Sequence, residues 1–266
     1  LVWAGMQQRV GAPPFTGDVL VEGNRIAAIA RAPARLPRDD APIVECAGAT
    51  LMPGLVDGHA HLSFVALTNF ADIGDIPPEE HAYATMHNAR TVLAAGFTSC
   101  LSAGAAKPRL DVALRAEIDA GRIPGPRLLA ASPELTTTGG LGDERKLHLY
   151  RESVAMIVDG ADEVRRAVRT LCREGVDTIK LNVSGNHTLS AGKAHLTLMS
   201  EPEVAAAVEA AHSFDKRVAA HCRSAASVKL ALRHGVEIIY HCDFADAEAI
   251  DLLEAGKDGV FLAPAL

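Results

Sequence analysis

The sequence has few cysteines and no long apolar run. Its five cysteines, at positions 46, 100, 172, 222 and 242, are an odd number without C-x-x-C spacing. This pattern argues against a disulfide framework or a zinc ribbon, so we expect all five thiols to be reduced and buried. The apolar runs are too short to cross a bilayer. No basic segment followed by an apolar stretch opens the printed sequence, so no signal peptide is expected and a cytoplasmic location is favoured.

Basic charge is also in short supply. The 26 Lys and Arg residues are outnumbered by 33 Asp and Glu residues, which gives a net charge of −7. The basic residues are scattered along the chain, which argues against nucleic acid as a partner. With 48% hydrophobic residues, the 266-residue chain has the composition of a globular protein with one large domain and room for a small companion. Eleven histidines are the one compositional hint of metal or acid–base chemistry.

The first part of the chain is predicted to be rich in β-structure. Apolar stretches at 19–21 and 26–29 flank a Gly-Asn turn, which is typical of a hairpin. A loop rich in proline and charge follows over 31–42, and a short strand is expected at 43–46. We place a domain boundary near residue 52, where Met-Pro-Gly interrupts the pattern.

After this boundary the chain repeats one phrase, in which a helix ends on glycine and a strand follows. The phrase occurs at 93–100, 172–181, 232–241 and 253–262. A glycine that ends a helix can adopt the left-handed conformation, and Ser200 with Glu203 predicts a capping box at the start of another helix. The expected strands are 55–60, 97–102, 127–132, 177–183, 217–222, 236–241 and 259–263. Parallel strands with intervening helices and no G-x-G-x-x-G or Walker loop favour a (β/α) barrel over a doubly wound sheet.

Four histidines fall at the predicted carboxyl ends of strands. His59 and His61 stand two apart, so they share one face of the first barrel strand. His221 ends the run V-A-A-H, and His241 ends I-I-Y-H. Barrel enzymes build their sites at this end of the strands, and neutral imidazoles are good zinc ligands. The H-x-H pair alone is a weak signal, and hydrogen-bonded core histidines are the alternative for the later two.

Lys180 ends the apolar part of D-T-I-K-L on the fourth predicted barrel strand. A bare ammonium is costly to bury, so Lys180 is expected to be paired, deprotonated or chemically modified. A Cys/His zinc site competes with the histidine site, because Cys222 and Cys242 each follow a histidine directly. Neighbouring residues on a strand point to opposite faces, so we expect these thiols to face the helices as small buried hydrophobes. We expect His81, His87, His212 and His234 at the surface, and leave open the histidines at 148, 187 and 195.

These motifs resemble those of the amidohydrolase superfamily, whose members pair a (β/α)8 barrel with a small β-sandwich made from both chain ends. The phrase M-P-G-L-V-D-G-H-A-H resembles the segment that enters the first barrel strand. G-P-R-L-L, L-T-T-T-G-G, I-K-L-N-V-S-G and the pair A-H-C and Y-H-C resemble the branch of imidazolonepropionase-like proteins, Xaa-Pro dipeptidases and ochratoxin-type amidases. The resemblance implies an α/β fold, with part of the β-sandwich at 1–52 and a TIM-type barrel at 53–266 that ends after its seventh strand.

The resemblance also implies a binuclear metal centre. His59 and His61 would bind one divalent ion and His221 and His241 the second, with zinc as the expected metal. Lys180, carboxylated by carbon dioxide, would bridge the two ions, and with His221 and His241 it is assigned to catalysis. A metal-bridging hydroxide would attack an amide. The family's acid–base aspartate, on an eighth strand, has no assignable counterpart in this sequence, and Asp57 is expected only to support the site from a deeper layer.

We therefore expect a binuclear metal hydrolase that cleaves a small amide, either dipeptide-like or an N-acyl amino acid. Lactones, cyclic amides and organophosphate esters stay open as substrates, because the same attack serves them. His187, Gly139 and Gly140 are candidates for the substrate rim, with a simple tight turn as the alternative for the glycines. A catalytically incomplete fragment or a non-enzymatic barrel that retains metal is the competing interpretation. We expect a homo-oligomer, with neither nucleic acid nor membrane as a partner.

Overall fold

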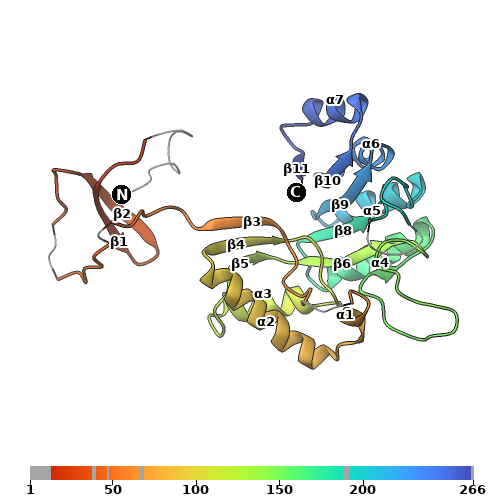
Figure 1. Ribbon diagram of the computed structural model, residues 1–266, viewed down its shortest axis with the longest axis horizontal. Coiled ribbons are helices and arrows are strands. Elements are labelled where there is room, and N and C mark those ends of the chain that lie inside the picture. The colour runs from red at the N-terminus through yellow and green to blue at the C-terminus, as the bar shows by residue number, and fades with distance from the viewer. Residues whose placement is uncertain (1–12, 38–39, 47, 66–68, 188–191, 265–266) are drawn as a thin grey trace. The chain divides into compact units, whose positions relative to one another are not determined.

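The computed structural model describes residues 13–37, 40–46, 48–65, 69–187 and 192–264 (Figure 1). The chain divides into two compact units, the first ending at Leu55 and the second beginning at Val56. In the first unit, β1 (Gly17–Glu22) pairs antiparallel with β2 (Arg25–Arg31), which confirms the predicted hairpin. The strand expected at 43–46 is wrong. This segment pairs with no other strand in the described part of the chain, and its Val44 side chain is 83% exposed.

The second unit alternates strands and helices along most of its length. Its elements are β3 (Leu55–Ala60), α1 (Asp72–Asp75), α2 (Pro78–Ala94), β4 (Phe97–Ser102), α3 (Leu110–Asp119), β5 (Arg127–Leu129), β6 (Ala131–Thr136), β7 (Met156–Ile157), α4 (Ala161–Arg173), β8 (Thr178–Asn182), α5 (Glu201–His212), β9 (Arg217–Ser224), α6 (Ala225–Arg233), β10 (Ile238–Phe244), α7 (Ala247–Ala255) and β11 (Phe261–Ala263). None of the helices that the structure describes combines the length and apolarity that a membrane crossing needs.

The strands of this unit form two sheets, in the orders β3-β4-β5 and β11-β10-β9-β8-β6-β7. The pairs β4–β5, β6–β8, β8–β9, β9–β10 and β10–β11 are all parallel. The segment 127–136 belongs to both sheets, because β5 and β6 are separated only by Ala130. The seven expected strands are therefore present in an α/β fold with parallel sheets. The strand expected at 127–132 is interrupted at Ala130, and its second part, β6, runs to Thr136.

The largest apolar core lies between the helices α4 and α5 and the strands β8 and β9. In α4, Val164 and Val168 stand four residues apart and are fully buried, as a helix with one apolar stripe requires. They belong to the same cluster as Ile179 and Leu181 of β8. Burial of each such side chain contributes roughly 2 kcal/mol to folding. This packing holds β8 with its carboxyl end toward the candidate site.

The predicted helix ends are largely as expected. Ser200 and Glu203 form the predicted capping box of α5. Of the four glycines that close a helix before a strand, Gly96, Gly175 and Gly235 have positive φ angles, whereas Gly256 has a φ of −91°. At Gly256 the helix ends without the left-handed residue, so that part of the prediction is wrong for the last repeat.

Candidate metal and catalytic site

The four predicted histidines meet at the carboxyl ends of three strands. His59 lies on β3, and His61 is the first residue after the end of that strand. His221 lies on β9 and His241 on β10. The ring centroids are 5.4 Å apart for His59 and His61, 5.0 Å for His59 and His241, and 4.4 Å for His221 and His241. Residues up to 182 positions apart thus form one cluster, which we call the histidine cluster, of His59, His61, His221 and His241.

An unusual backbone conformation places His241 in the cluster. His241 and Cys242 have φ angles of 76° and 62°, which are rare for residues with a side chain. The pairing of β10 with β9 shifts register between His241 and Phe244. Such strain persists where the surrounding structure enforces it, and it is concentrated at functional sites.

The ring nitrogens of the cluster fit a divalent metal ion chemically. The His61 Nδ1 atom is 3.2 Å from the Gly104 carbonyl oxygen, and the His221 Nε2 atom is 3.0 Å from that of Gly185. A carbonyl bond to one ring nitrogen fixes the ring and leaves the other nitrogen to bind a metal. The Nδ1 atom of His241 is buried without a partner among the described residues. In that same part of the chain, no three His, Cys, Asp or Glu side chains are already arranged as a metal centre.

Electrostatics keeps these imidazoles neutral. Burial, followed by the charge of Lys180, lowers the pKa of His59 to about 2 and that of His61 to about 4. Burial and then the charge of Arg223 lower the pKa of His241 to about 4, and burial also lowers the pKa of His221 well below its usual value. Neutral imidazole is the form that binds a metal, so these side chains are in their ligand form near neutral pH.

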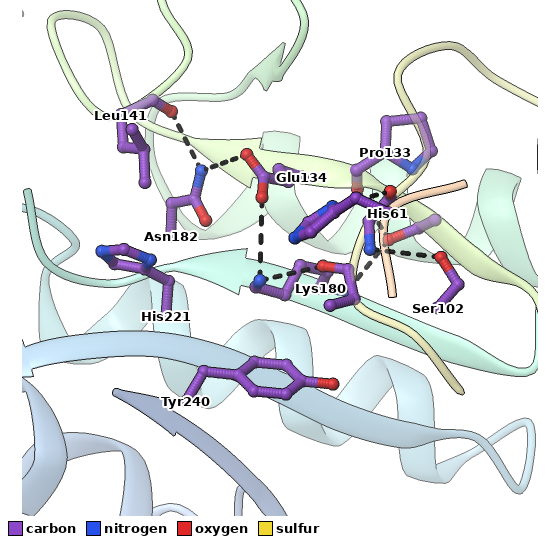
Figure 2. Close-up of polar contacts among 12 residues, drawn as sticks. His61, Ser102, Pro133, Glu134, Leu141, Lys180, Asn182, His221 and Tyr240 are labelled. Atoms are coloured by element: carbon purple, nitrogen blue, oxygen red, sulfur yellow. Dashed lines mark hydrogen bonds and ion pairs between the residues drawn. The ribbon is translucent and has the colours of Figure 1, made fainter. Parts of the chain in front are cut away.

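Lys180 reaches the same site from β8, and its side chain is 1% exposed. Its Nζ atom donates to the Ala103 carbonyl oxygen at 2.8 Å and lies 3.6 Å from the Glu134 carboxylate (Figure 2). It also sits 4.6 Å from the centroid of the Tyr240 ring. Burial lowers the pKa of the Lys180 ammonium, and the Glu134 charge opposes this change. The structure thus brings the lysine to the histidine cluster with a carboxylate beside it.

Glu134 is the main site residue that was not predicted from the sequence. It is 5% exposed, its Oε2 atom accepts a hydrogen bond from Asn182 at 2.9 Å, and it pairs with Lys180 across β6 and β8. Gly104 leaves it room, because a Cβ atom there would lie 2.9 Å from the Glu134 Cγ atom. The available signal was a lone charged residue in the run L-L-A-A-S-P-E-L-T, which the predicted strand left out by ending at residue 132.

The predicted substrate residues lie on the loops that follow β6 and β8. His187 is exposed, with its Nε2 atom 3.5 Å from Asp243 and its ring 5.9 Å from that of Phe244. Gly139 and Gly140 form a tight turn, in which Gly139 has a φ of 74° and the Gly140 amide donates to the Thr137 carbonyl oxygen at 2.9 Å. The turn accounts for these glycines structurally, and their role toward a substrate stays a prediction.

Other expectations for histidine and cysteine are partly corrected. The prediction that His81 lies at the surface is wrong. This side chain is fully buried on the inner side of α2, and its Nε2 atom lies 2.6 Å from the Ser63 carbonyl oxygen. His87 and His212 are exposed as expected, and His234 is half-buried. The histidines at 148 and 195 are exposed. Cys46 is exposed, contrary to the prediction, whereas Cys222 is fully buried as expected and Cys242 is half-buried.

Comparisons with known proteins cover nearly the whole chain. Residues 50–265 match the model of the Amidohydrolase family. The ochratoxinase of Aspergillus niger is 26% identical, and the match covers 96% of this chain and 56% of that relative. A solved prolidase complexed with N-methylphosphonate-L-proline is 30% identical with a TM-score of 0.81, covering 94% of this chain and 61% of its own. A Xaa-Pro dipeptidase with methionine bound in its active site is 29% identical with a TM-score of 0.79, covering 92% and 61%. The chain thus spans between 56% and 61% of the length of these three proteins.

Proposed function

Because the chain belongs to the amidohydrolase family, we propose that the protein is a metal-dependent hydrolase that cleaves the amide bond of a dipeptide or an N-acyl amino acid. One observation carries the proposal. Lys180 and four histidines, from four strands of a parallel sheet system, gather at the strands' carboxyl ends with neutral imidazoles. The names of the ochratoxinase and the Xaa-Pro dipeptidase support a peptide-like substrate.

The proposal includes a complete architecture for the whole protein. The seven strands over 53–266 would be part of an eight-stranded (β/α) barrel. The hairpin within 1–52 would be part of a small β-sandwich. The boundary between the two domains would lie near residue 52.

The residues present would hold two divalent ions, for which zinc is the favoured metal. His59 and His61 would hold one ion and His221 and His241 the other, with Lys180 between them. When bound, two such ions activate water as a nucleophile near neutral pH and polarise the substrate carbonyl. The carbonyl oxygens of Gly104 and Gly185 hold the rings of His61 and His221 in place, so these ligands need little reordering.

Lys180 would act as a carboxylated ligand. Its lowered pKa favours the neutral amine, whose nitrogen lone pair would form a bond to the carbon of carbon dioxide while one proton passes from the nitrogen to solvent water. The product is an anionic oxygen ligand on the lysine, which replaces a costly buried cation. Glu134 works against this step, because its charge raises the pKa of the ammonium. Burial has the larger effect on that pKa and favours deprotonation.

The test combines metal analysis with a panel of dipeptides and N-acyl amino acids, using the protein at its full length. We expect about two divalent ions per chain in the wild type, and loss of both metal and hydrolysis in Lys180→Ala and His241→Ala, because each removes a ligand. The matched control is His87→Ala, which removes an exposed histidine of α2 and should change neither quantity. Bound metal without turnover of any amide would refute the proposed hydrolase activity and favour a metal-retaining barrel. A full metal content in His241→Ala would refute the assignment of this residue as a ligand.

A further inference from the structure

Arg223 is a half-buried cation beside the histidine cluster, and the proposed chemistry gives it no role. It follows His221 by two residues on β9, so the two side chains leave the same face of the strand. Its side chain is only 16% exposed. The guanidinium donates through Nη1 to the Asp243 carboxylate at the end of β10, and the Arg223 backbone N–H donates to Ser184 Oγ at 2.8 Å. These contacts hold the arginine at the rim of the site.

One edge of the guanidinium makes no hydrogen bond to any described residue. Its Nε atom is buried and has no hydrogen-bond partner in the described part of the chain. Asp243 is the one acidic side chain that pairs with Arg223 among the described residues, and His187 approaches the same carboxylate at 3.5 Å. A buried donor left without an acceptor costs free energy, so an acceptor supplied by a ligand would be favoured here.

The charge of Arg223 reaches the histidine cluster. It is among the charges that lower the pKa of His59, His221 and His241. Arg223 thus places a positive charge at this end of the strands, although the chain as a whole carries a net charge of −7. A local positive field of this kind attracts an anionic ligand to the site.

The chemistry of guanidinium identifies the anion. Its planar fork of N–H donors matches the two oxygens of a carboxylate, and the free Nε edge can make such a paired contact. In an N-acyl amino acid or a dipeptide, only the amide nitrogen and one carbon separate the scissile carbonyl from the carboxylate carbon. A group that binds this carboxylate must therefore lie close to the residues that act on the carbonyl, as Arg223 lies close to His221.

We propose that Arg223 binds the free carboxylate of the substrate and thereby selects amides of amino acids that carry a carboxylate next to the scissile bond. This inference rests on the proposed amide hydrolysis and names its substrate class. Asp243 positions the guanidinium through the Nη1 contact and leaves the other edge for the substrate.

The test compares two substrates with the same scissile bond. One is the best dipeptide or N-acyl amino acid of the panel, and the other is its decarboxylated counterpart, in which hydrogen replaces the carboxylate. We expect the wild type to prefer the first by about a hundredfold in kcat/KM, and Arg223→Met to lose most of that preference. Arg223→Lys should keep the positive charge but only part of the preference, because an ammonium lacks the planar fork of N–H donors. Arg173→Met, which removes an exposed arginine, is the matched control.

A purely structural role for Arg223 predicts a different pattern. Asp243→Asn removes the charge of the partner but keeps an oxygen that can accept from Nη1, so the arginine should stay in place and the preference for the carboxylate should be kept. If Arg223→Met and Asp243→Asn instead lower activity equally on both substrates, Arg223 only tethers the rim and the proposal is overturned. Turnover without preference in the wild type would overturn it as well.

Equilibrium binding of the same two compounds to the metal-free protein gives a readout independent of turnover. We expect the carboxylate compound to bind the wild type at least tenfold more tightly than Arg223→Met, and the decarboxylated compound to bind both equally. Such binding without any turnover would refute the proposed hydrolysis and leave the assignment of Arg223 intact. Equal binding of the carboxylate compound to wild type and Arg223→Met would overturn the assignment.

Discussion

Several charged residues of the second unit are buried. Lys180, Glu134 and Asp111 are each at most 5% exposed, and each has a nearby group that offsets part of the cost. Lys180 has Glu134 and a carbonyl oxygen, whereas Asp111 accepts a hydrogen bond from the Ser102 hydroxyl and has no cationic partner among the described residues. One carboxylate oxygen of Asp111, Oδ1, has no partner at all in that part of the chain. Asp111 is therefore a residue through which stability should depend on pH.

Burial raises the pKa of Asp111 to about 6 from an ordinary value of 3.8. Between these values the folded protein holds a proton that the unfolded chain releases, so this residue's stabilising effect is complete below pH 3.8 and is lost as pH rises through 6. The loss amounts to about 3 kcal/mol at most. We expect Asp111→Asn to remove this dependence. The free energy of unfolding of the variant, relative to that of the wild type, should therefore rise when the pH is raised from 4 to 7. Urea unfolding at both pH values measures it.

Asp119→Asn is the control for Asp111, because it changes an exposed aspartate of the same helix. Its difference in stability from wild type should be the same at pH 4 and pH 7. A constant difference for Asp111→Asn as well would contradict the raised pKa.

At the scale of elements, the start of α5 joins two helices through one side chain. The Glu203 carboxylate accepts the Ser200 backbone N–H at 2.7 Å, as the capping box requires. Its second oxygen accepts the backbone N–H of Gly160, the residue that precedes α4, also at 2.7 Å. The box follows from the local sequence, whereas the bond to Gly160 depends on how α4 and α5 pack.

We expect Glu203→Ala to lower the free energy of unfolding by about 2 kcal/mol, because two backbone donors lose their acceptor. Ser200→Ala removes one capping hydroxyl and should cost about 1 kcal/mol. Glu209→Ala is the control, since this exposed glutamate of α5 contributes only a 3.4 Å surface pair with Arg165. Equal losses for Glu203→Ala and Ser200→Ala in denaturant unfolding would show that the bond to Gly160 adds nothing.

At the scale of the whole molecule, a metal bound to the histidine cluster ties together strands that are far apart in the chain. β3 and β10 would contribute ligands on segments separated by about 180 residues, and the Tyr240 hydroxyl already donates to the Gly58 carbonyl oxygen at 3.1 Å. An ion that binds only the folded state stabilises the whole unit.

We therefore expect zinc, at a hundred times its dissociation constant, to raise the free energy of unfolding of the chelator-treated protein by about 2.7 kcal/mol. Thermal unfolding with and without zinc measures the effect. His241→Ala should lose most of it, and His87→Ala should keep it. A shift of equal size in His241→Ala would place the ion elsewhere.

The sequence by itself determined the order of elements and the main candidates for chemistry. Strand and helix periodicity, glycines at helix ends and the capping box are local patterns, and the structure confirms the positions of the seven strands. The histidines and Lys180 could be predicted as one cluster because the carboxyl ends of parallel strands meet at one edge.

Only the tertiary structure decided which charges lie beside that cluster. Glu134 meets Lys180, and Arg223 meets Asp243, through the pairing of neighbouring strands, and His81 is buried because of the face that α2 turns inward. These contacts join residues from 18 to 46 positions apart, and they depend on strand register, on the interruption at Ala130 and on the left-handed backbone at His241. A one-residue change of register would move each side chain to the opposite face, so local sequence patterns alone do not determine them.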